Sequence, residues 1–174
     1  EDGFAASMRR RVLSMREVTD LSVRFDPVVS HDRIATIHDL TSRLHCHWLV
    51  MNWRDFTFYN PYGWLINHVS CDLALFRDVG IRYIRRILVY PEPGPNDGLV
   101  AMAADRLANS YIASLTFARF VPDDADDARV AHETAYLEQS CKLCSHEADT
   151  LILRGDNEHD TVIEETKKYD LLVT

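Results

Sequence analysis

The chain has 174 residues, 47% of them hydrophobic, which is enough to build one large or two small globular domains. Its formal net charge of -8 argues against nucleic acid as a partner, because proteins that bind nucleic acid need a basic surface. No apolar run reaches the roughly eighteen residues of a membrane-spanning helix, and the N-terminus lacks the apolar block of a signal peptide.

The first half predicts three strands, each preceded by a helix, from apolar residues at helical spacing and short strand-like runs. In chain order we expect helix 3–17, strand 21–25, helix 31–44, buried strand 47–51, helix 62–69 and strand 71–76. The first helix contains the basic stretch MRRRVLSMR (8–16). That stretch is most simply a solvated helix face, with a phosphate-binding or lipid-facing role as the alternative. A polar, aromatic loop is expected from Asn52 to Pro61.

The second half alternates strands and helices more clearly. A buried run, IRRILVY, ends at a loop rich in proline and glycine, and the Asp residues of VPDDADD can cap the helix that follows. In chain order we expect strand 84–90, helix 99–110, strand 113–120, helix 127–146, a strand within 149–157, helix 161–168 and strand 169–174. This alternation predicts an α/β fold with a doubly wound parallel sheet and helices on both faces.

The two halves share an order of elements over part of their length. VRFDPVVSHDRIATIHDLTSRLHCHWLVM aligns loosely with ILRGDNEHDTVIEETKKYDLLVT, as a strand, an Arg-x-Asp turn, a helix and a strand containing Leu-Val. We therefore expect two incomplete copies of one α/β unit, 1–79 and 80–174. The first copy lacks its start and the second lacks its last helix and strand, so we expect a piece of a longer protein.

This ordered set of segments resembles the universal stress protein family, whose fold is also called adenine nucleotide alpha hydrolase-like. The resemblance rests on a first strand ending ILVYPE, an Ala-rich helix, the strand ASLTF, a Val-Pro loop, a long helix, the turn RGDN and the strand DLLVT. It covers 84–174 well. It covers 20–77 moderately, where HWLVM and GWLINHVSCDLALF are similar to the family's fourth strand, closing helix and fifth strand. It implies a tandem of doubly wound α/β units.

In the nucleotide-binding branch of that family, ATP lies at the carboxyl ends of the strands. An acidic residue follows the first strand, and a glycine-rich loop follows the fourth. The resemblance therefore implies nucleotide-crevice positions at Glu92, Gly94, Arg154, Asp156 and Gly63.

The phosphate-binding pattern itself is degenerate in this chain. Pro93 stands where the family often has glycine, only Gly63 matches a glycine of the phosphate loop, and Trp64 replaces its small hydroxyl residue. Phosphate binding needs exposed backbone N–H groups, which glycines provide. Bulky side chains fill the rest of the first copy's loop, namely Trp53, Phe56, Phe58 and Tyr59. We therefore expect no bound cofactor, with ATP as the alternative ligand.

Tandem units of this kind also form cytosolic tails of transporters of the amino-acid permease and cation–chloride cotransporter type. NPYGWLINHVSCDLALF resembles those tails. The resemblance implies a non-catalytic regulatory or assembly domain, cytoplasmic at the inner face of the plasma membrane, whose partner is the transmembrane domain of the same polypeptide. It also implies a homodimer edge at Leu73, Leu75 and Phe76, because the family pairs through its fifth strand. The alternatives are a free-standing ATP-binding stress protein and a slow nucleotidase.

Several other residue sets have the residue types of a functional site. Cys141 and Cys144 with His146 have the residue types of a metal or redox site, but one CxxC is a weak signal and packing on a shared helix face is the simpler interpretation. His38, His45, Cys46 and His47 also have the residue types of metal ligands, but a capping or edge role is the simpler interpretation.

The remaining polar motifs favour structural roles. For Arg24 to Asp26 and for Arg154 to Asp156, we expect the Asp to cap the next helix rather than to bind a ligand. No nucleophile–base pair or triad pattern appears, and the paired Asp residues of 123–127 fit a solvated loop, so we expect no enzyme activity and no metal site.

Overall fold

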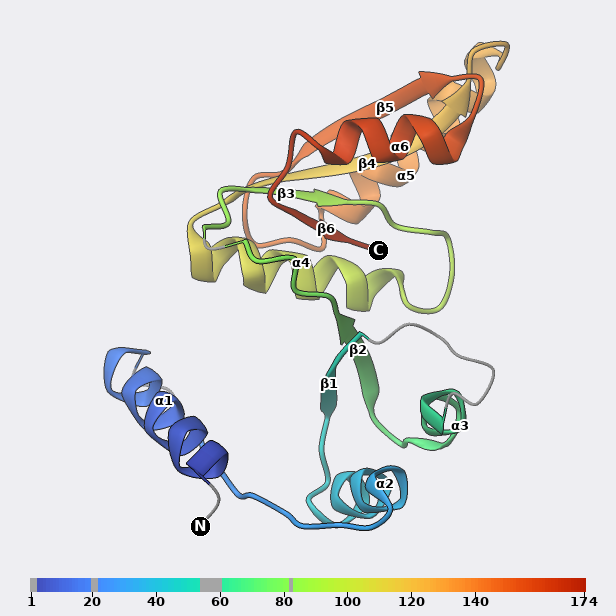
Figure 1. Cartoon of the computed structure of the whole chain (residues 1–174). Coiled ribbons are helices and arrows are strands. Elements are labelled where there is room, and N and C mark those ends of the chain that lie inside the picture. Colours follow the sequence, from blue (N-terminus) through green and yellow to red (C-terminus); the bar gives the residue numbers. More distant parts are fainter. Residues whose placement is uncertain (1–2, 20–21, 54–60, 82) are drawn as a thin grey trace. The chain divides into compact units, whose positions relative to one another are not determined.

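The computed structural model describes residues 3–19, 22–53, 61–81 and 83–174 (Figure 1). The chain divides into two compact units, Glu1–Asp78 and Val79–Thr174. The border expected at 79/80 lies one residue from this division. That each unit is a copy of a universal-stress-like unit stays a prediction. None of the described helices has the length and apolar content needed to cross a bilayer.

The unit Val79–Thr174 is an α/β fold with seven alternating elements. They are β3 (Arg86–Val89), α4 (Asp97–Tyr111), β4 (Ser114–Pro122), α5 (Asp127–Cys141), β5 (Asp149–Gly155), α6 (Glu158–Thr166) and β6 (Leu171–Val173). The four strands are parallel in the order β5-β4-β3-β6, so the chain runs outward from β3 to β5 and then returns to the other side of β3. The predicted doubly wound parallel sheet is therefore confirmed.

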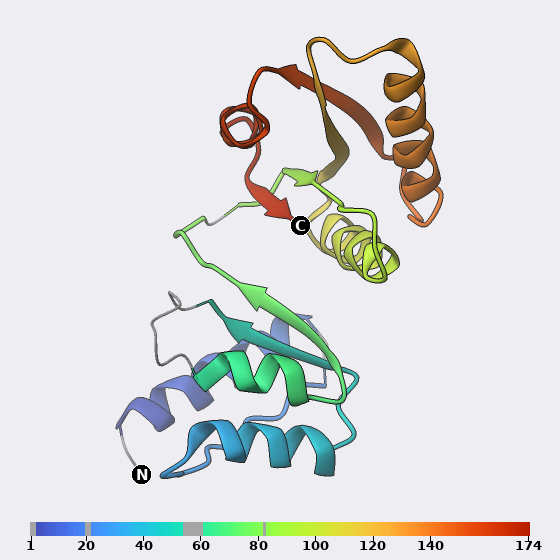
Figure 2. The ribbon, with the colours of Figure 1, turned by 90° about the vertical axis from the view of Figure 1, so that its right-hand side faces the viewer.

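Alternate residues of β3 and β4 build two separate cores. Ile87, Val89, Leu115 and Phe117 pack with the alanines of α4 and with Leu137 of α5. Leu88, Tyr90, Ala118 and Leu153 form the other core, against which residues of the α6 region pack. Figure 2 shows α4 and α5 on one face of the sheet and α6 on the other. A strand buried on both faces must be apolar throughout, which is why IRRILVY lacks a polar alternation after Arg86.

The helix ends in this unit are set by side chains and partly correct the sequence-based expectations. Asp126 caps α5 as expected, its carboxylate accepting from the Arg129 N–H at 2.8 Å. The cap of α6 is Asn157, which accepts from the Asp160 N–H at 3.1 Å, so the expectation for Asp156 was wrong. Because Asn157 starts the helix, α6 begins three residues before the expected 161.

Helix α5 ends at Cys141 rather than at 146. The cause is Asp105 on α4, whose carboxylate accepts from the backbone N–H groups of Ser145 at 3.0 Å and His146 at 3.2 Å. A side chain 40 residues away thus captures the donors that a continuing helix would use. As a result Cys144 lies in the turn after α5, and the expectation that both cysteines share a helix face was wrong.

The unit Glu1–Asp78 contains α1 (Gly3–Thr19), α2 (Arg33–Arg43), β1 (Trp48–Asn52), α3 (Pro61–His68) and β2 (Asp72–Phe76). Strands β1 and β2 are parallel, with Trp48 opposite Asp72. Helices α2 and α3 pack together, and Thr41 and Leu65 are buried. Strand β1 was expected to be buried, but Val50 is 66% exposed, because among the described elements this sheet has only two strands.

The strand expected at 21–25 is wrong for residues 22–25, which form no strand, while Leu21 lies outside the described residues. Alternating apolar residues make a strand only when a neighbouring strand pairs with them, and the described sheet here consists of β1 and β2 alone. Asp26 forms an exposed ion pair with Arg24 at 2.5 Å, and Asp32 caps α2, so Asp26 was the wrong cap. Most of the loop expected at 52–61 falls on 54–60, outside the described residues.

Candidate functional site

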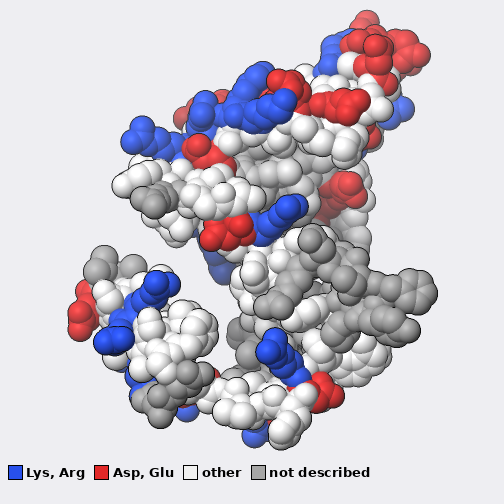
Figure 3. Space-filling view, viewed as in Figure 1, with Lys and Arg blue, Asp and Glu red and all other residues white. Residues whose placement is uncertain are grey.

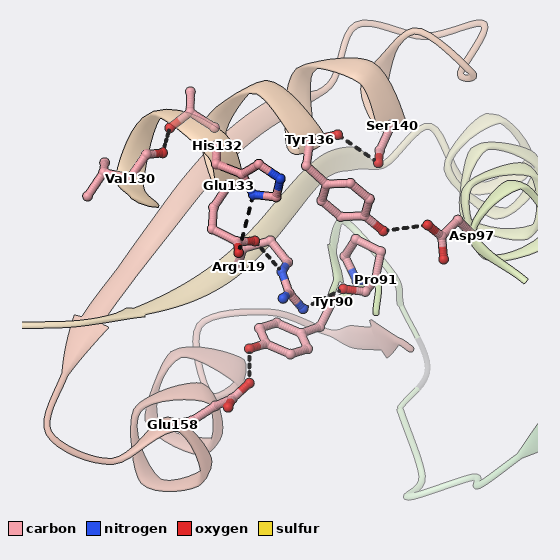
Figure 4. Close-up of polar contacts among 11 residues, drawn as sticks. Tyr90, Pro91, Asp97, Arg119, Val130, His132, Glu133, Tyr136, Ser140 and Glu158 are labelled. Carbon is pink, nitrogen blue, oxygen red and sulfur yellow. Dashed lines mark hydrogen bonds and ion pairs between the residues drawn. The ribbon is translucent and has the colours of Figure 1, made fainter. Parts of the chain in front are cut away.

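Polar side chains gather at the carboxyl ends of β3 and β4 (Figure 4). Phe117 is the last residue of β4 that pairs with β3, so Arg119 stands just past the end of β3. Parallel strands bring the loops that follow them to one edge, where α/β proteins place their ligands. We call this group the Arg119 cluster, and its members are Tyr90, Asp97, Arg119, Glu133, Tyr136 and Glu158.

Arg119 lies at the centre of the cluster, where four neighbouring residues contact its guanidinium. Its Nε donates to Oε2 of Glu133 at 2.9 Å, and its Nη1 donates to the Pro91 carbonyl at 2.9 Å. The rings of Tyr90 and Tyr136 lie 5.6 and 5.8 Å from its Cζ, which is cation–π distance. Burial alone would lower the pKa of Arg119, but the hydrogen bond and charge of Glu133 outweigh it and raise the pKa.

Tyr136 of α5 and Asp97 of α4 join the two helices on this face of the sheet. The Tyr136 hydroxyl donates to Oδ2 of Asp97 at 2.8 Å. Burial, followed by this hydrogen bond and the Asp97 charge, raises the pKa of Tyr136 to about 12. The other oxygen of Asp97, Oδ1, is buried with no hydrogen-bond partner among the described residues.

Tyr90 connects the cluster to the opposite face of the sheet. Its hydroxyl donates to Oε1 of Glu158, in the first turn of α6. Burial, and then the hydrogen bond to Glu158, raise the pKa of Tyr90 above its ordinary value. The one contact therefore ties the end of β3 to the start of α6.

The contacts of this cluster hold β3, β4, α4, α5 and α6 to one another. Both hydroxyls stay protonated at neutral pH and are already donating, and the Arg119 charge is balanced by Glu133. A depression of about 470 Å³ lies on α6 and is lined by Asp160, Thr161, Glu164 and Glu165.

The positions implied as nucleotide-crevice positions follow different elements, and their use as a nucleotide site stays a prediction. Glu92 and Gly94 are exposed in the loop after β3, whereas Arg154 and Asp156 are exposed at the end of β5. Strand β4 lies between β3 and β5, which separates the two pairs by about 10 Å of sheet. Gly63 belongs to the unit Glu1–Asp78 and lies inside α3, in the region where a helix was expected.

The proposed dimer edge lies on β2, whose described neighbour is β1. Leu73 is half-buried, whereas Leu75 and Phe76 are 38% and 48% exposed. Parallel pairing of β1 with β2 leaves one backbone edge of β2 without a described partner strand. Its use as a homodimer edge stays a prediction.

The cysteine and histidine candidates have contacts that fit packing and helix-capping roles. Cys141 and Cys144 pack against the core beside α4 and α5. Burial, then the charges of Asp105 and Cys141, raise the pKa of Cys144 to about 11, which disfavours the thiolate that metals and redox partners need. His45 has a left-handed φ of 48° directly after α2, and its N–H donates to the Ser42 carbonyl at 3.3 Å, which is a helix-capping role. Among the described residues, no three His, Cys, Asp or Glu side chains could hold a metal ion.

Sequence reasoning missed the Arg119 cluster as a unit. One signal was present: an arginine inside the apolar run ASLTFARF. A cation within a buried strand needs an acidic partner, and that requirement could have directed the search to α5. The identity of the partner, Glu133, depends on how α5 lies over the sheet.

Comparisons with known proteins add little. No protein-family model matches the chain, and no curated protein matches its sequence. Among solved structures, the chain is similar to protein Rv1636 from Mycobacterium tuberculosis H37Rv, with 17% identical residues and a TM-score of 0.39. That similarity covers 54% of this chain and 72% of the other. The fold class stated above rests on the strand order and connections themselves.

Proposed function

We propose that the chain is a non-catalytic regulatory or assembly domain whose carboxyl edge is closed by its own side chains. One observation carries the proposal: Arg119 fills the space past the end of β3 and is held there by Glu133 and the Pro91 carbonyl. With side chains only 15% and 11% exposed, the pair presents little accessible surface to a ligand. A domain that binds no small molecule at this edge would act through the surfaces by which it contacts other protein segments.

The finer proposal concerns where such a domain works. We infer a cytosolic tail of a transporter of the amino-acid permease or cation–chloride cotransporter type, at the inner face of the plasma membrane. The resemblance of NPYGWLINHVSCDLALF to those tails supports it. Dimerisation of this domain through β2 would then bias the conformation of the membrane domain of the same polypeptide.

Isothermal titration of the whole chain with ATP tests the proposal that the carboxyl edge of the sheet holds no nucleotide site. We expect no saturable heat. Micromolar binding that disappears in Glu92→Gln and persists in the matched control Glu147→Gln would overturn the proposal. ATP turnover measured on the same samples tests the absence of enzyme activity, and hydrolysis that is lost in Glu92→Gln would contradict it.

Binding of ATP or another adenine nucleotide by a free-standing stress protein is the second candidate. It is favoured by the buried Oδ1 of Asp97, which can accept one more hydrogen bond beside the exposed Glu92 loop. The titration described above separates the two functions.

Dimerisation is tested by light scattering during size-exclusion chromatography. We expect a dimer that becomes a monomer in Phe76→Lys, because a charge on β2 opposes burial of that strand. Val50→Lys on β1 is the matched control, since Val50 is also exposed on the same small sheet, and it should leave the dimer intact. A wild-type chain that stays monomeric at all concentrations contradicts this part of the proposal.

A further inference from the structure

Helix α1 has an apolar stripe along one side. Phe4, Met8, Val12 and Met15 recur at intervals of four, four and three residues, which places them on one face of a helix. Phe4 is 74% exposed and Met15 is 61% exposed, while Met8 and Val12 are half-buried. The stripe is about 16 Å long at 1.5 Å per residue. None of the other described elements makes more than a marginal contact with α1.

The same helix is strongly basic. Arg9, Arg10, Arg11 and Arg16 lie along it, and its one acidic residue is Glu17. Figure 3 shows basic side chains next to uncharged atoms on α1. Arginine stems can lie along an apolar surface while the guanidinium groups reach polar or charged partners at its edge.

This positive charge is local, because the acidic excess of the protein lies in the other unit. Residues 79–174 contain ten basic and seventeen acidic residues, whereas residues 1–78 contain nine basic and ten acidic ones. The unit that carries α1 is therefore close to neutral, and α1 is its concentrated positive feature. An anionic surface would attract this unit while it repels the other.

We propose that α1 is a membrane-surface helix that binds an anionic lipid bilayer. The apolar stripe enters the boundary between headgroups and acyl chains, and the arginines pair with the lipid phosphates and carboxylates. A short apolar stripe with arginines on both sides of it, and with too little apolar length to span, fits an interfacial helix. An acidic protein surface would satisfy the arginines but would leave the stripe exposed to water.

This inference stands independently of the proposed closure of the carboxyl edge, since it uses no residue of the Arg119 cluster. A failed lipid test would leave the ATP titration unaffected, and the reverse also holds.

Co-sedimentation of the whole chain with vesicles tests the proposal. Vesicles of phosphatidylcholine mixed with phosphatidylserine should bind the chain, and pure phosphatidylcholine vesicles should bind it far more weakly. Binding should fall with added salt, because surface charges are screened. Each arginine lost near an anionic surface lowers the partition coefficient about fivefold, so R9Q/R10Q/R11Q should lower it about a hundredfold.

Two further variants complete the test. K142Q/K167Q/K168Q removes the same number of positive charges from exposed positions of the other unit and should keep binding near the wild-type level. F4S/M15S removes the exposed ends of the stripe and should weaken binding at every salt concentration. Far-UV circular dichroism checks that each variant keeps its helix content.

Three results would overturn the proposal. One is no binding to anionic vesicles by the wild-type chain. Another is an equal loss in the lysine triple variant, which would assign binding to net charge alone. The third is self-association of the chain that R9Q/R10Q/R11Q abolishes without any vesicle binding, which would assign the basic face to the acidic unit of a second copy.

Discussion

Arg119 and Glu133 form an ion pair with 2.9 Å between Nε and Oε2, and both side chains are largely withdrawn from water. The pair joins β4 to α5, while the Arg119 Nη1 reaches the Pro91 carbonyl at the end of β3. Three elements thus depend on a single guanidinium. Because each buried charge needs its partner, the pair specifies how α5 lies on the sheet.

Removing one member of this pair should destabilise the protein far more than removing both. In Arg119→Met or Glu133→Leu, an unpaired buried charge remains, and we expect a loss of about 3–5 kcal/mol in the free energy of unfolding. The double variant R119M/E133L should lose less than either single variant. Urea unfolding followed by circular dichroism measures all three, and additive losses would show that the pair is not coupled.

Tyr136→Phe should destabilise the fold by about 1–3 kcal/mol, because it removes the donor to Oδ2 of Asp97 beside an Oδ1 that already has none. Tyr111→Phe is the control, since Tyr111 is 51% exposed. The folded state raises the pKa of Tyr136 to about 12, so the hydroxyl's stabilisation is complete below the unfolded pKa of about 10 and is lost as pH rises towards 12. The gap between wild type and Tyr136→Phe should therefore narrow in alkali, and a constant gap would contradict this assignment.

Gly155→Ala should destabilise the sheet edge by about 1–3 kcal/mol, because the added Cβ would collide with Oγ1 of Thr161. In G155A/T161A the colliding atom is gone, and most of the loss should be recovered. Gly98→Ala is the control, since its Cβ would meet open space in α4, and it should be neutral or stabilising by up to about 1 kcal/mol. Urea midpoints decide between these outcomes, and no recovery in the double variant would assign the loss to the backbone.

Acid should release the connection between α4 and the turn after α5. Burial would raise the pKa of Asp105, but hydrogen bonds from Ser145 and His146 outweigh it and lower the pKa. The resulting stabilisation is present above the unfolded carboxyl pKa of about 4 and is lost as pH falls through the lower folded value. Asp105→Asn should therefore lose less stability between neutral pH and pH 3 than the wild type does. Asp124→Asn, in an exposed loop, should behave as the wild type, and identical curves for all three chains would contradict the role of Asp105.

The sequence predicted the second unit well because its strands are nearly continuous apolar runs. Ile87–Val89 and Leu115–Phe117 are buried on both faces, and such runs identify strands without knowledge of their neighbours. The expectations that were wrong concerned segments whose structure depends on residues distant in the sequence. Residues 22–25 alternate correctly but lack a described strand to pair with, and α5 ends early because Asp105 lies beside it in space.

Adjacent polar residues also made it difficult to predict which side chain caps a helix. Asp156 and Asn157 are both good helix caps, and only the backbone conformation selects Asn157. Pro93 and the missing glycines indicated a degenerate phosphate loop, and the absence of a bound nucleotide stays a prediction. Arg119 was not anticipated, because its role comes from partners on α5 and after β3 that no local pattern specifies.

The position of β6 has a consequence for how the chain folds. Strand β6 pairs with β3, and Asp170 accepts from the backbone N–H groups of Arg85 and Arg86, each at 2.9 Å. The central strand β3 therefore cannot complete its pairing until a segment more than 80 residues later has been synthesised. Such non-local pairing slows folding. Until residues 170–173 leave the ribosome, the apolar edge of β3 stays open, so nascent chains should be prone to aggregation and to capture by chaperones during that interval.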